Sequence, residues 1–61
     1  MFSENEFKAR FIEELARSGK LDVISNMEIA AEFAEDNWQV YKDNPDGTPE
    51  EWAQDEVREW E

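Results

Sequence analysis

Seventeen of the 61 residues are Asp or Glu. Their carboxylates are the side chains of this sequence that could take part in the largest number of chemical roles. Carboxylates can pair as general acid and base, bind calcium, or present a row of negative charge to a cationic surface. The sequence has no Cys and no His, which excludes thiolate nucleophiles, Ser–His pairs and Cys/His zinc sites. The spacing of the acidic residues must decide among the remaining roles.

The turn from Asp43 to Gly47 is similar in composition to a calcium-binding loop, but its spacing is wrong. With Gly47 at the sixth position of such a loop, Lys42 stands at the first and Ala53 at the twelfth, where carboxylates are required. The sequence also places no pair of carboxylates in a pocket that could separate their pKa values. We therefore expect no enzymatic activity, no catalytic or metal-binding residue and no cofactor.

The acidic residues are concentrated in the last two thirds of the chain. The formal net charge is −11; residues 1–20 hold four acidic and four basic side chains, so residues 21–61 carry the whole excess. Direct binding to nucleic acid or to an anionic membrane needs a basic patch, and we expect neither. The sequence has no long apolar run and no secretory signal, which predicts a cytoplasmic protein.

Helical spacing arranges the acidic residues in two rows. At 3.6 residues per turn the rows consist of Glu28, Glu32 and Glu35, with Asp36 beside them, and of Glu51, Asp55 and Glu59. A step of four residues advances about 6 Å, the same order as the roughly 3.4 Å between successive phosphates of a nucleic-acid strand. The rows are therefore candidate phosphate surrogates, although acidic helix faces are also common as solvated, solubilising surfaces.

Three helices must position these rows, and each has a start signal. Ser3 and Glu6 have the spacing of a capping box, and Gly19 is a suitable C-terminal cap, which predicts a helix near 4–18. A second box at Ser25 and Glu28 predicts a helix near 26–42.

The second box is flanked by Ile24 and Ile29 at the positions of a hydrophobic staple. The third start has Thr48 as the cap, Pro49 at the first helical position and Glu51 completing a box, which predicts a helix near 49–60.

The three amphipathic helices predict a small all-α three-helix bundle, with residues 1–61 as one domain. The expected core consists of Phe7, Phe11, Leu15, Ile29, Phe33, Val40 or Tyr41, Trp52 and Val57. Glu56 lies in the middle of the apolar stripe of the third helix and makes that stripe imperfect.

Two tryptophans are candidates for an exposed apolar anchor among the acidic side chains. Trp38 lies at the margin of its stripe and Trp60 stands one residue before the last, so we expect one of them to be partly exposed. Trp is enriched among the residues that dominate protein interfaces. The eight aromatic residues are also more than a chain of this size is expected to bury alone, which is compatible with a homodimer.

With its very short length, lack of Cys, acidic helical faces and a few aromatic residues that are expected to be exposed, the sequence resembles the small phage-encoded inhibitors of host defence. This group includes anti-restriction and anti-CRISPR proteins that act as DNA mimics, and the resemblance covers residues 21–61. It implies an inhibitor that occupies the nucleic-acid-binding surface of a basic protein in the host cytoplasm. The alternative is a small structural or regulatory helical module, such as a homodimeric adaptor or an antitoxin-like partner, whose acidity serves solubility.

Overall fold

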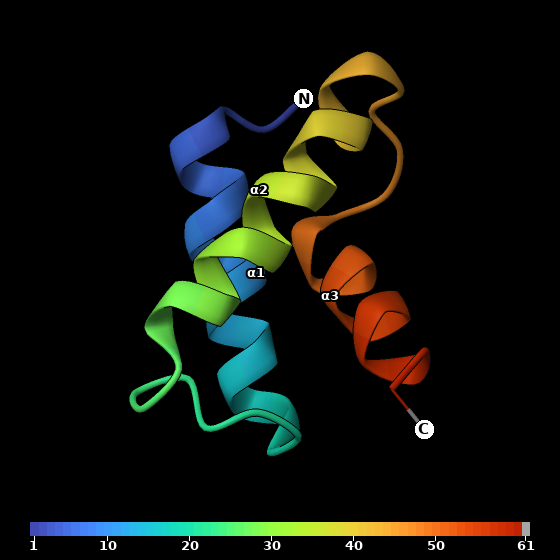
Figure 1. Ribbon diagram of the computed structural model, residues 1–61. Coiled ribbons are helices and arrows are strands. Elements are labelled where there is room, and N and C mark those ends of the chain that lie inside the picture. The colour runs from blue at the N-terminus through green and yellow to red at the C-terminus, as the bar shows by residue number, and fades with distance from the viewer. Residues whose placement is uncertain (61) are drawn as a thin grey trace.

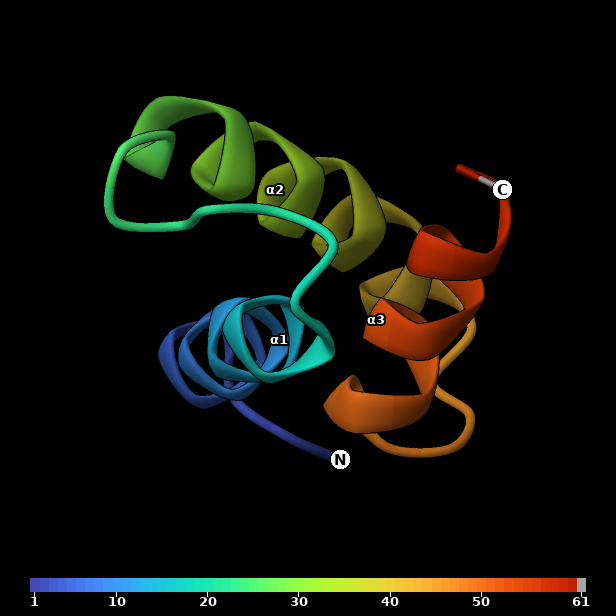
Figure 2. The ribbon, with the colours of Figure 1, turned by 90° about the horizontal axis from the view of Figure 1, so that it is seen from below.

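Helices α1 (Glu4–Ser18), α2 (Met27–Asp43) and α3 (Pro49–Arg58) follow one another in the computed structural model, which describes residues 1–60. α1 and α2 run in opposite directions, and the view along α1 shows α2 and α3 on different sides of it (Figures 1 and 2). The predicted small all-α three-helix bundle is confirmed. Within residues 1–60, no helix has both the length and the apolar character needed to cross a bilayer.

The predicted caps of α1 and α3 are present. The Ser3 hydroxyl accepts a hydrogen bond from the Glu6 N–H at 3.2 Å, and the Thr48 hydroxyl accepts one from the Glu51 N–H at 3.3 Å. Gly19 ends α1 with φ at +72°, a left-handed conformation that glycine adopts without steric cost. α3 ends at Arg58, two residues earlier than predicted.

The start of α2 differs from the prediction. Asn26 is the N-cap residue and its side chain makes no capping bond, so the expected box at Ser25 is wrong. Asp22 organises a preceding turn instead: its carboxylate accepts the Ser25 N–H at 3.3 Å, and its carbonyl accepts the Asn26 side-chain amide at 2.8 Å. This turn leaves Ile24 91% exposed, so Ile24 does not form the predicted staple.

The core is centred on the Phe7 ring of α1. Its centroid lies 4.5 Å from that of Tyr41, 5.7 Å from that of Trp38 and 6.0 Å from that of Phe11. Aromatic pairs at these separations contribute beyond the area they bury. The buried apolar side chains are Phe7, Phe11, Leu15, Val23, Ala30, Ala34, Trp38, Tyr41, Ala53 and Val57.

The buried face of α2 is rotated relative to the predicted stripe. Ala30 and Ala34 are fully buried, whereas Ile29 is 43% and Val40 57% exposed. Because alanine adds little bulk, these two positions let α2 approach α1, and Trp38, one turn further on, reaches the Phe7 ring. The prediction that Ile29 lies in the core is therefore wrong, and of the two alternatives Val40 and Tyr41 it is Tyr41 that is buried.

Phe33 and Trp52, also predicted in the core, are only partly buried and pack against its edge. Trp52 packs edge-on against Tyr41, with 5.7 Å between the ring centroids. Its indole N–H donates a hydrogen bond to the Asp46 carbonyl at 2.6 Å. The remaining predicted core residues, Phe7, Phe11, Leu15, Tyr41 and Val57, are buried as expected.

Candidate functional site

The acidic side chains of α2 and α3 fall into two groups that the sequence pattern did not separate. One group braces the bundle through contacts with another helix. The other group is exposed to solvent. Apart from Asp43 at the end of α2, it contains six residues, the last of them directly after α3, which we call the outward carboxylates: Glu28, Glu32, Asp36, Glu51, Asp55 and Glu59. All six are exposed.

Five of the outward carboxylates have no ion-pair partner among residues 1–60, the exception being Asp55. Asp55 lies 3.4 Å from the Arg58 guanidinium, with both side chains 73% exposed. Exposed pairs of this kind are weak and open to exchange with an external partner. Glu51 and Asp55 on α3 and Glu59, directly after its end, thus form the exposed row that their spacing predicts.

Glu35, predicted to belong to the row on α2, is a bracing residue. It forms an ion pair with Lys8 of α1 and accepts a hydrogen bond from Gln39 at 3.1 Å. The hydrogen bond from Lys8 holds the pKa of the Glu35 carboxyl below its ordinary value of 4.5, with a smaller contribution from Gln39. The exposed acidic row of α2 therefore consists of Glu28, Glu32 and Asp36.

Two further bracing carboxylates come from α3. Glu50 pairs with Arg10 of α1 at 2.9 Å, and that hydrogen bond holds the pKa of Glu50 below its ordinary value. Glu56 accepts a hydrogen bond at 3.0 Å from the side-chain amide of Asn37 on α2. The position of Glu56 within the apolar stripe was the signal in the sequence that this residue faces a neighbouring helix.

Trp38 is not available as a surface anchor, because only 8% of it is exposed. Trp60 fits the predicted role better. It is half-buried, and its ring centroid lies 5.1 Å from that of Phe33 on α2. The two rings join α2 to the turn that follows α3, and the outward carboxylates Glu32 and Glu59 stand next to them in sequence.

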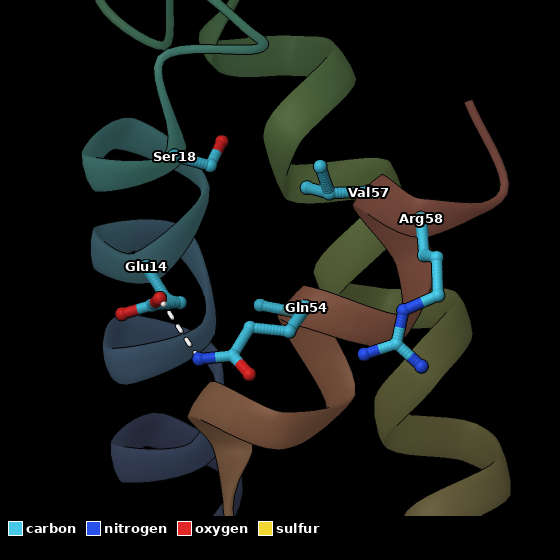
Figure 3. A pocket seen from close by; sticks show the side chains of 6 residues that line it. Glu14, Ser18, Gln54, Val57 and Arg58 are labelled. Carbon is cyan, nitrogen blue, oxygen red and sulfur yellow. Dashed lines mark hydrogen bonds between the residues drawn. The ribbon is translucent and has the colours of Figure 1, made fainter. Parts of the chain in front are cut away.

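A hollow of about 190 Å³ lies between α1 and α3 (Figure 3). Ala53 and Val57 supply its apolar lining, and Gln54 donates a hydrogen bond to Glu14 at 3.2 Å across its rim. Within residues 1–60, acidic side chains form no cluster of three suited to a metal ion.

No protein-family model matches the chain, and neither a curated protein nor a solved structure shows significant similarity to it. The outward carboxylates and the adjoining aromatic pair are therefore the features from which a function can be argued.

Proposed function

We propose that the protein binds the basic, nucleic-acid-binding surface of another protein and blocks it, with the outward carboxylates in the place of phosphates. The observation that carries the proposal is that the acidic side chains have two different structural roles. Glu35 and Glu50 brace the fold against bases of α1, whereas the outward carboxylates are left to solvent and five of them have no ion-pair partner within residues 1–60.

The repulsion between neighbouring outward carboxylates lowers the stability of the helices, and this cost supports a functional role for them. Glu28 and Glu32 are four residues apart on α2, as are Glu32 and Asp36, and each such like-charge pair destabilises a helix by about 0.2–0.5 kcal/mol. The same repeats place Glu51, Asp55 and Glu59 along α3. A cationic groove would relieve this repulsion on binding and would steer the encounter over long range.

The proposed partner is a basic nucleic-acid-binding protein, and the proposed site of action is the cytoplasm in which that partner works. The proposal is in keeping with the resemblance to phage-encoded inhibitors of host defence. Nucleic acid itself is not a ligand in this proposal, because the same carboxylates would repel its phosphates.

The deciding experiment is capture of binding proteins from bacterial lysate on the immobilised protein, at low and at high salt, followed by challenge with DNA or RNA. We expect the captured protein to be released by nucleic acid and by rising ionic strength. Retention of the captured protein in the presence of excess DNA and RNA would contradict the proposal.

A matched pair of charge reversals tests the position of the charge. Glu32→Lys and Glu13→Lys change the net charge equally, but Glu32 is an outward carboxylate of α2, whereas Glu13 lies on α1, within residues 1–20, where four acidic and four basic side chains balance. We expect Glu32→Lys to weaken capture strongly and Glu13→Lys to weaken it little. Equal losses would show that only the total charge matters.

A second candidate function, a homodimeric structural module, is favoured by one observation. Ile24 is 91% and Met27 53% exposed at the connection between α1 and α2, away from the outward carboxylates of α3. An apolar contact between two copies through this end would be nearly insensitive to salt. Sedimentation at several salt and protein concentrations distinguishes it from the inhibitor, which is expected to remain monomeric.

A further inference from the structure

The face shared by α2 and α3 carries an apolar stripe that the bundle does not bury. Ile29 and Phe33 are four residues apart on α2, and Val40 follows Phe33 by seven, so the three lie along one side of the helix. Ile29 and Val40 are 43% and 57% exposed. Phe33 is half-buried, and the half-buried ring of Trp60 packs against it with an angle of 43° between the two ring planes.

Carboxylates lie close in sequence to both rings of the aromatic pair. Asp36 follows Phe33 by three residues, which places it next to Phe33 on the surface of α2, and Glu32 directly precedes Phe33 and lies one turn from Asp36. In the turn after α3, Glu59 directly precedes Trp60. We call this combination the aromatic–acidic face; it consists of Phe33, Trp60, Glu32, Asp36 and Glu59.

A second copy of this chain does not fit the aromatic–acidic face. A two-fold contact would set the carboxylates of one copy against those of the other, and each chain carries a net charge of −11. Like charges facing each other across an interface oppose association. Charge complementarity therefore requires a cationic occupant, and the aromatic pair requires that this occupant also offer an apolar or aromatic platform.

Resting on the proposed function, we infer that the blocked partner is a protein that binds single-stranded nucleic acid. Duplexes present phosphates outward and hide their bases in the stack, so a mimic of duplex needs charge alone. Single strands present phosphates together with the flat faces of bases, and their binding proteins combine a basic groove with aromatic stacking platforms. In the aromatic–acidic face, the carboxylates correspond to phosphates, and the rings of Phe33 and Trp60 correspond to stacked bases.

A displacement assay with two panels of purified proteins tests this inference. One panel consists of single-strand-binding proteins with OB folds preloaded with fluorescent oligo-dT; the other consists of helix-turn-helix proteins preloaded with fluorescent duplex. We expect the protein to displace oligo-dT and to leave the duplex complexes largely intact. Trp60→Ala should raise the concentration of the protein that is needed to displace half of the oligo-dT by about tenfold or more. This is the change in affinity expected for the loss of one stacked base.

Matched variants separate stacking from folding and from charge. Trp60→Phe should restore most of the displacement, and Ile24→Ser, which removes an exposed apolar side chain elsewhere, should change nothing. Thermal unfolding of each variant confirms that it is folded at the assay temperature.

Each outcome has a distinct reading. Displacement of duplex with no effect of Trp60→Ala would overturn the single-strand inference and leave the proposed function standing. Failure to displace either probe would overturn both. Displacement of oligo-dT that is unchanged by Trp60→Ala would also overturn the inference, because charge alone would then account for binding.

Discussion

Arg10 of α1 and Glu50 of α3 form a two-point ion pair, with Nε to Oε2 at 2.9 Å and the second guanidinium nitrogen to Oε1 at 3.2 Å. The same guanidinium lies 4.8 Å from the centroid of the Phe2 ring, a cation–π distance. One side chain therefore ties together the N-terminal segment, α1 and the first turn of α3. The hydrogen bond that Arg10 donates to Glu50 raises the pKa of Arg10 above its ordinary value.

Replacing Arg10 by Lys should lower the midpoint of thermal unfolding, although the charge is kept. Lys offers a point charge and loses the planar fork that satisfies both oxygens of Glu50. Circular dichroism melts of Arg10→Ala, Glu50→Ala and the double variant give the coupling between the two side chains. Strictly additive effects of the two single changes would show that the pair contributes nothing.

Acidification should reduce the contribution of the Glu35–Lys8 pair. The folded pKa of Glu35 is lowered, so its stabilising effect is present above the unfolded value of 4.5 and is lost as pH falls through the lower folded value. The stability difference between the parent and Glu35→Gln should therefore be constant near neutral pH and shrink below about pH 4.5. A difference that does not change with pH would contradict this assignment.

Truncating Trp38 should unfold or severely destabilise the protein. Trp38→Ala removes a buried ring in contact with Phe7 and Tyr41, and such changes cost about 3–5 kcal/mol. Trp60→Ala, at a half-buried position near the chain terminus, should cost much less. Urea titrations followed by circular dichroism measure the free energy of unfolding of both variants. Equal decreases in that free energy would contradict the different burial of the two rings.

Removing an outward charge should separate stability from binding. Glu32→Gln relieves repulsion from Glu28 and Asp36, so we expect it to stabilise the helix by a few tenths of a kcal/mol per pair. The same change should weaken binding to the captured partner. A variant with lower stability and unchanged binding would indicate that Glu32 acts within the fold.

Adding a side chain at Gly19 should destabilise the end of α1. No atom lies near the position of an added Cβ, so the cost of Gly19→Ala comes from the positive φ of 72° and amounts to about 1–2 kcal/mol. Gly19→Asn should cost less, since Asn tolerates this conformation better. The ranking is checked by denaturant titration of the three proteins.

The helices could be predicted because their signals are local. The caps at Ser3 and Thr48 lie within a few residues of the backbone groups they satisfy. The cap at Ser25 was predicted wrongly because a competing local partner, Asp22, holds that residue in a turn before the helix.

The orientation of α2 and the roles of the acids depend on contacts distant in sequence. Ala30 and Ala34 carry a weak apolar signal, yet they are the fully buried positions of α2, and with this face inward Ile29 and Val40 are exposed. Likewise Glu35 and Glu32 look equivalent in sequence, and only the position of Lys8 on another helix makes Glu35 a bracing residue. The exposure of Glu28, Glu32 and the row formed by Glu51, Asp55 and Glu59 could be predicted, because it depends only on the helical period.

The bases of α1 have a consequence for how the molecule travels toward a partner. Lys8, Arg10 and Arg17 offset three of the four acidic side chains of α1, so that helix is close to neutral, while the outward carboxylates gather on α2, on α3 and in the turn after α3. The protein is therefore an electric dipole as well as an anion. In the field of a cationic surface it experiences a torque that turns α2 and α3 forward before contact, so a larger share of collisions begins in a productive orientation.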